Sequence, residues 1–132
     1  MREPDSDAGE AVVLYDSDCG FCKWSLNKIL AWDRDRRLRP VAIQSEEGQR
    51  LLAPVPAERR LDSWHLALPG GRVESAGAGA PPLARRLPGG RPLALLFERF
   101  PRATERAYRA VAGRRATWAR LLRIDSSCEL RR

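Results

Sequence analysis

The chain has 132 residues and a net charge of +7 at pH 7, with 43% hydrophobic and 31% charged residues. This balance is typical of a single folded domain and excludes an intrinsically disordered chain. No run approaches the roughly 20 apolar residues of a membrane-spanning helix, and the polar segment 1–10 does not resemble a secretory signal, so we expect a cytoplasmic protein with no membrane contact.

The first half of the chain alternates strand and helix patterns. Residues 11–15 are apolar and rich in β-forming types, which predicts a buried strand. Helical spacing follows over 19–32, and residues 38–43 predict a second strand, in which Pro40 favours an edge position. Residues 45–52 predict a short helix that begins at a serine N-cap.

The second half begins with a predicted hairpin and continues as helix. Residues 64–68 and 72–74 predict two strands joined by a Pro-Gly-Gly turn. Gly77 and Gly79 predict a flexible connection, and Pro81 and Pro82 suit the first turn of a helix that extends to Leu87.

The C-terminal part has the longest helical pattern of the chain. Residues 93–100 are apolar and fit either a strand or a helix, whereas residues 102–123 predict one helix. Four residues are expected along one side of that helix: Tyr108, Val111, Trp118 and Leu122.

Together these elements predict an α/β fold with the order β-α-β-α-β-β-α, followed by one or two extra C-terminal helices. Two strands joined through a helix form a parallel pair with a right-handed crossover, and the hairpin then completes a mixed sheet. We expect a flexible N-terminus at 1–10, a single domain at 11–125 and a tail at 126–132. This is the order that a thioredoxin-like domain needs.

Cys19-Gly20-Phe21-Cys22 is a CxxC motif that lies directly after a predicted strand and opens a helix. At that place unpaired backbone N–H groups and the helix dipole stabilise an anion, so we expect Cys19 to be the attacking thiolate. Cys22 shares the apolar stripe of the helix with Leu26 and Ile29, so we expect a more buried, less ionised resolving thiol.

Two carboxylates flank the motif. Asp18 adjoins Cys19, where it either caps the helix or, when ionised, opposes formation of the thiolate. Asp16 ends the first strand and has two interpretations of equal weight. It accepts the proton of the resolving thiol, or it is a turn residue that bonds to its own backbone.

A structural zinc site is the chemical alternative to redox activity. Such a site takes four protein ligands, and no second CxxC motif is present. The remaining candidates are His65, which we expect to face the surface, and Cys128, interpreted as an incidental free thiol close to the C-terminus. We therefore predict no metal and no cofactor.

The segment Leu14-Tyr-Asp-Ser-Asp-Cys-Gly-Phe-Cys22 resembles the signature of the DCC family of predicted thiol-disulfide oxidoreductases, in which Asp16, Cys19 and Cys22 occupy the Asp-x-x-Cys-x-x-Cys positions. The resemblance extends over nearly the whole chain after residue 10 and includes Ser63-Trp64, Gly71-Arg72-Val73, Ala80 with Leu83 and Leu87, and a Tyr-x-x-x-Ala-x-x-Arg pattern at Tyr108, Ala112 and Arg115.

This resemblance implies a thioredoxin-like fold, protein-disulfide reductase activity and a protein or low-molecular-weight thiol or disulfide as substrate. The sequence departs from the family pattern at Ser17, where glycine is usual. It also departs from thioredoxins before the third strand, where they carry a cis-proline and this chain has Asp62 and Ser63.

Arginines dominate the C-terminal part of the chain. Arg99, Arg102, Arg106 and Arg109 recur at spacings of three or four, which places them on one face of a helix. This face is either simply solvated or the surface of a non-catalytic module that binds an acidic partner or nucleic acid, an alternative that we rank below the redox enzyme. Arg115 lies on the apolar side, and we expect it to pair with a carboxylate such as Asp16.

Overall fold

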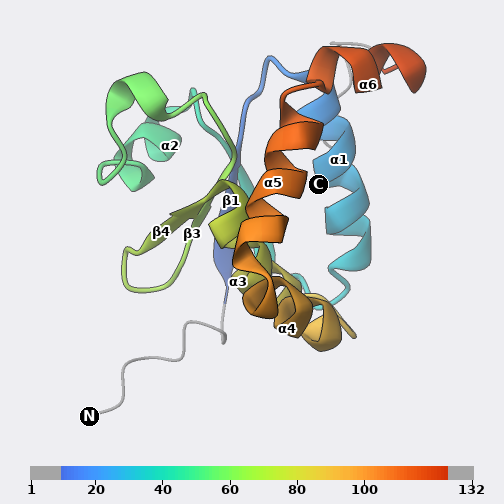
Figure 1. Ribbon diagram of the computed structural model, residues 1–132. Coiled ribbons are helices and arrows are strands. Elements are labelled where there is room, and N and C mark those ends of the chain that lie inside the picture. Colours follow the sequence, from blue (N-terminus) through green and yellow to red (C-terminus); the bar gives the residue numbers. More distant parts are fainter. Residues whose placement is uncertain (1–9, 125–132) are drawn as a thin grey trace.

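The computed structural model describes residues 10–124, which form one sheet with helices on both of its faces (Figure 1). The strands are β1 (Ala11–Tyr15), β2 (Leu38–Ala42), β3 (His65–Ala67) and β4 (Val73–Ser75). The α-helices in this part of the chain are α1 (Gly20–Trp32), α2 (Glu46–Leu51), α3 (Ala80–Arg85), α4 (Arg91–Arg99), α5 (Pro101–Ala112) and α6 (Arg115–Leu121), and two short 3-10 helices are η1 (Ala57–Arg59) and η2 (Ala76–Gly79).

The sheet is mixed, with the strand order β2-β1-β3-β4. β1 and β2 are parallel, so that Tyr15 lies opposite Ala42, whereas β3 runs antiparallel to both β1 and β4. Pro40 lies in β2, an edge strand, where a residue that lacks a backbone N–H does the least harm to the sheet. The predicted α/β fold with a thioredoxin-like mixed sheet is therefore confirmed.

β1 is buried on both of its faces, which is why its sequence is a continuous apolar run. Ala11 and Val13 belong to the core cluster that includes Leu26 and Leu30 of α1. Val12 and Leu14 point the other way, into a second cluster with residues that flank α2. Figure 1 shows α2 on one side of the sheet and α1 with α5 on the other.

The predicted flexible connection at Gly77 and Gly79 is wrong, because these residues form the packed 3-10 helix η2. A Cβ atom on Gly77 would lie 2.8 Å from the Cα of Glu105 in α5, and one on Gly79 would lie 2.9 Å from the Trp64 ring. The two glycines allow close packing of η2 against its neighbours and are both buried.

The single helix predicted over 102–123 is two helices, since α5 ends at Ala112 and α6 begins at Arg115. Gly113 follows α5, and its N–H donates to the carbonyl of Arg109 at 2.8 Å. Three helices thus follow α3 within residues 10–124, against the one or two expected. None of the residues of α5 is fully buried, and Val111 near its end is exposed. Trp118 on α6 and Leu122 just beyond it are exposed as well, so the predicted apolar side of this segment is not a buried one.

The four arginines do not share one helix. Arg99 ends α4, whereas Arg102, Arg106 and Arg109 lie on α5. Phe100 separates the two helices, and Pro101 begins the second. The three arginines on α5 are exposed, and Arg109 pairs with Glu105 of the preceding turn at 3.0 Å. None of the helices within residues 10–124 has both the length and the apolar character that crossing a lipid bilayer requires.

Candidate active site

A hydrogen-bonded turn connects β1 to α1 and fixes where the cysteines begin. The backbone N–H of Asp18 donates to Oδ1 of Asp16 at 2.9 Å, and the N–H of Cys19 donates to the Asp16 carbonyl at 3.2 Å. Gln44, which follows β2, donates from Nε2 to the same Asp16 oxygen at 2.7 Å and accepts from the Ser17 hydroxyl at 2.9 Å. The turn is therefore held both by its own backbone and by the neighbouring parallel strand.

Cys19 is the N-cap of α1, a place that we assigned to Asp18 in one interpretation of the sequence. Its backbone is extended, and its Sγ accepts the backbone N–H of Cys22 at 3.3 Å. A sulfur in this position lies at the positive end of the helix dipole, in contact with one of the N–H groups that have no partner within the helix. Negative charge on Cys19 is stabilised by this placement.

Cys22 lies one turn into α1, and its side chain is hydrogen-bonded to that of Cys19. Both thiols are free. Burial raises the pKa of the Cys22 thiol to about 12, and the hydrogen bond and the charge of Cys19 act in the same direction. Burial therefore keeps the Cys22 thiol protonated at neutral pH.

Arg115 is the cation of the site, and its predicted pairing with Asp16 is wrong. Its Nη1 lies 3.7 Å from Sγ of Cys22, and its Nε donates to the carbonyl of Ala112 at 3.1 Å. The turn after α5 produces this contact, because it redirects the chain so that α6 begins beside α1. The Arg115 guanidinium opposes the effect of burial and lowers the pKa of Cys22.

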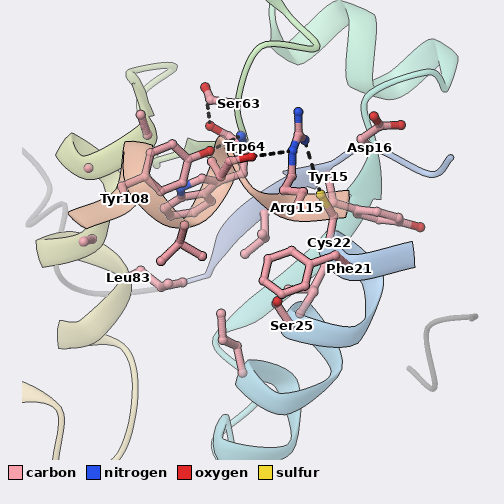
Figure 2. A pocket seen from close by; sticks show the side chains of 18 of the residues that line it. Tyr15, Asp16, Phe21, Cys22, Ser25, Ser63, Trp64, Leu83, Tyr108 and Arg115 are labelled. Atoms are coloured by element: carbon pink, nitrogen blue, oxygen red, sulfur yellow. Dashed lines mark hydrogen bonds between the residues drawn. The ribbon is translucent and has the colours of Figure 1, made fainter. Parts of the chain in front are cut away.

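A cavity of about 440 Å³ opens beside Cys22. Figure 2 shows Trp64, Tyr108 and Leu83 on one side and Phe21 with Ser25 of α1 on the other, with Arg115 near Cys22. Most of the lining is aliphatic or aromatic. It comes from β1, from η2, from the helices α1, α3, α4, α5 and α6, and from residues adjoining these elements. Asp16 lines the same cavity, so the structure brings the three predicted site residues to one region.

The loop before β3 forms one wall of this cavity. Asp62 and Ser63 precede Trp64 where thioredoxins have a cis-proline, and no peptide bond within residues 10–124 is cis. The backbone N–H of Trp64 donates to the Tyr108 hydroxyl at 3.3 Å. Burial raises the pKa of Tyr108, so this hydroxyl stays protonated at neutral pH.

The sequence matches the family model of the DCC1-like thiol-disulfide oxidoreductases over residues 13–121. The chain belongs to the DCC1-like thiol-disulfide oxidoreductase family. Searches of curated proteins and of solved structures give no match.

The matched region of this DCC1-like protein contains both cysteines, Asp16 and Arg115. Within residues 10–124 no group of three or more histidine, cysteine or acidic side chains is arranged to hold a metal ion.

His65 does not face the surface as expected. It is 1% exposed, and its ring nitrogens contact the Ser75 hydroxyl at 2.6 Å and the Arg60 carbonyl at 2.8 Å. Cys128 lies outside the described residues.

The sequence analysis missed Gln44. The signal that would have identified it is topological, because the carboxyl ends of two adjacent parallel strands meet at one edge of a sheet. β1 ends at Tyr15 and β2 at Ala42, so the residues that follow each strand in this DCC1-like protein are neighbours. Asp16 and Gln44 are such residues, and their contact is 2.7 Å long.

Proposed function

We propose that this protein is a thiol-disulfide oxidoreductase that cycles Cys19 and Cys22 between a dithiol and a disulfide. One observation carries the proposal. The Cys19 sulfur caps α1 and accepts the N–H of Cys22, whose own thiol is half-buried beside it and has a raised pKa. An accessible sulfur that is stabilised as an anion, next to a protonated partner, is the arrangement that exchange through a mixed disulfide needs.

In the first step the Cys19 thiolate attacks one sulfur of a substrate disulfide. A bond forms between Cys19 and that sulfur, the substrate S–S bond breaks, and the other sulfur leaves as a thiolate that takes a proton from solvent. Because Cys22 is still a thiol at this stage, it does not compete with Cys19 for the substrate.

In the second step Cys22 loses its proton and attacks Sγ of Cys19. The Cys19–Cys22 disulfide forms and the bond between Cys19 and the substrate sulfur breaks. That sulfur leaves as a thiolate, which takes a proton, and two electrons have passed from the protein to the substrate. Arg115 lies within reach of the Cys22 sulfur and stabilises its thiolate. The carboxylate of Asp16, which lines the same cavity, is our candidate for the proton acceptor.

The substrate is a protein disulfide or a low-molecular-weight disulfide, and a cellular dithiol returns the protein to its reduced form. A cytoplasmic location suits this direction of exchange, because the cytoplasm supplies reducing thiols. No cofactor takes part in these steps.

The test compares Cys19→Ser with Cys22→Ser, both in a Cys128→Ser background that leaves only the two site cysteines. Cys19→Ser abolishes exchange with a disulfide substrate, because Cys22 is half-buried and its raised pKa keeps it protonated. The Cys22→Ser variant still attacks the substrate through Cys19 but cannot break the mixed disulfide that results. This species therefore accumulates, and mass spectrometry detects it by the added mass of one half of the substrate. Mixed disulfides that form on Cys22 instead of Cys19, or exchange that persists in Cys19→Ser, would contradict the proposal.

A further inference from the structure

The cavity beside Cys22 has the size and the lining of a small-molecule site. Its volume of about 440 Å³ falls within the range of roughly 300–1,000 Å³ that such pockets occupy. Apolar side chains such as Phe21, Leu83, Phe97 and Val111 line it, and a few polar groups gather at the end where Cys22 and Arg115 lie. An apolar cavity with a small number of polar groups at one end binds a molecule that is itself mostly apolar.

We propose that this cavity binds the apolar substituent of a low-molecular-weight disulfide that the Cys19–Cys22 pair reduces. The inference rests on the proposed function and specifies its substrate class. Cys19 does not line the cavity, but its sulfur accepts the N–H of Cys22, which does. Because the carbon attached to a sulfur leaves the S–S axis sideways, we place the substituent on the sulfur bound to Cys19 in the space beside Cys22.

Two features favour a small molecule over an extended protein segment. The cavity lies between α1, the sheet and α5 and has the volume of a small ligand. In addition, the backbone N–H of Trp64 in the cavity wall is already donated to the Tyr108 hydroxyl at 3.3 Å, so it is not free to pair with the backbone of a bound peptide. The cavity is thus suited to a side group, such as an aromatic ring, and not to a strand.

The chemistry is that of the proposed function. Each cycle breaks one substrate S–S bond, forms the Cys19–Cys22 disulfide and releases two thiols, which carry the two protons and two electrons of the dithiol. A dithiol such as dithiothreitol then reduces the protein again. The apolar part of the cavity takes no part in bond breaking. Its contribution is to hold the apolar group while Cys19 attacks.

The test mixes the reduced Cys128→Ser protein with bis(2-phenylethyl) disulfide or with bis(2-hydroxyethyl) disulfide and follows oxidation of the cysteine pair by acid quench and mass spectrometry. Each rate constant is divided by that of the same disulfide with free dithiothreitol, which corrects for intrinsic reactivity. We expect the phenylethyl compound to show saturation and a normalised rate about tenfold higher, because burial of an aromatic ring is worth at least that factor.

Two phenylalanine substitutions on α5 provide the matched comparison. Ala107 lines the cavity, whereas Ala110 lies on the same helix, is also exposed and does not line it. A107F should remove most of the preference for the phenylethyl compound, and A110F should retain it. Circular dichroism checks that both variants fold, and Ala107→Leu replaces A107F if that variant unfolds.

The outcomes separate the two proposals. Equal normalised rates for the two disulfides, or an equal preference in A107F and A110F, would overturn the assignment of the cavity while leaving the redox activity in place. If the protein reacts with neither disulfide faster than a free dithiol does, the proposed function itself fails.

Discussion

At the scale of single residues, the properties of Cys22 result from two opposing effects. Burial removes water from its thiol and raises the pKa to about 12, and the neighbouring Cys19 adds to this. The Arg115 guanidinium, 3.7 Å from the sulfur, lowers the pKa. A resolving thiol benefits from both, because it stays protonated in the resting state and is still stabilised as a thiolate when it attacks.

Arg115→Gln tests this role of the guanidinium. In a Cys19→Ser, Cys128→Ser background, where Cys22 is the only cysteine, we expect iodoacetamide to alkylate Cys22 about tenfold more slowly at pH 9 after Arg115→Gln. The guanidinium lowers the pKa of Cys22, and a hydrogen bond to a charged group is worth about 1.5 kcal/mol, which corresponds to this factor. Arg115→Lys, which keeps the charge, should restore part of the rate. An unchanged rate would mean that the guanidinium acts only in packing.

Asp16→Asn separates the two interpretations of Asp16. Asparagine keeps an oxygen that accepts the N–H of Asp18, so the turn before Cys19 is retained. If Asp16 accepts the proton of Cys22, release of the second thiol slows by about a hundredfold and the mixed disulfide accumulates, as measured by quench and mass spectrometry. If the residue acts only in the turn, Asp16→Asn reacts normally and Asp16→Ala does not.

At the scale of elements, the position of α5 depends on a close approach between backbones. Gly77 in η2 packs against α5 so closely that a Cβ atom would lie 2.8 Å from the Cα of Glu105, and its N–H donates to Glu105 Oε2 at 3.1 Å. Because α5 carries Tyr108 and leads to Arg115, this contact sets how far one wall of the cavity lies from the other.

Gly77→Ala should therefore destabilise the fold. The added methyl group meets the Cα and N atoms of Glu105 in the backbone of α5 as well as the end of the Glu105 side chain. The side chain can move away but the backbone cannot, so we expect a loss of about 1–3 kcal/mol in the free energy of unfolding, as measured by urea denaturation. Ala78→Ser, at the exposed neighbouring position, should stay within about 0.5 kcal/mol of the parent. Equal free energies of unfolding for the two variants would show that the close approach of η2 to α5 is not needed for stability.

At the scale of the whole molecule, the buried titratable groups predict how stability depends on pH. Burial raises the pKa of Cys22, Tyr15 and Tyr108, so between about pH 9 and 12 the folded chain holds protons that the unfolded chain releases. The stability that these groups contribute is complete below pH 9 and is lost as the pH rises. Burial lowers the pKa of His65, so its contribution is present above pH 6.5 and is lost as the pH falls.

We therefore expect maximal stability between about pH 7 and 9, with a decline on both sides. Urea denaturation of the reduced Cys128→Ser protein from pH 5 to 11 measures this profile. Cys22→Ser provides the control, because removal of the thiol should make the alkaline decline shallower while leaving the acidic limb unchanged. An alkaline decline of equal slope in Cys22→Ser would contradict the assignment to Cys22.

The sequence by itself determined the features that depend on neighbouring residues. A CxxC motif after an apolar strand fixes Cys19 at the start of a helix and Cys22 one turn later. The serine cap of α2 and the order of strands and helices along the chain follow from equally local patterns. The face of β3 was not predicted, because β3 lies between two strands and is buried on both sides, so alternation along three residues does not reveal that His65 points inward.

Only the tertiary structure decided what surrounds the cysteines. Arg115 lies 93 positions from Cys22 in the sequence, and its contact depends on the break after α5 and on the packing of η2 through Gly77. The cavity arises from the same packing, and the bond between Gln44 and Asp16 depends on the register of two parallel strands. Contacts of this kind are set by how whole elements pack, and local patterns of residues do not contain that information.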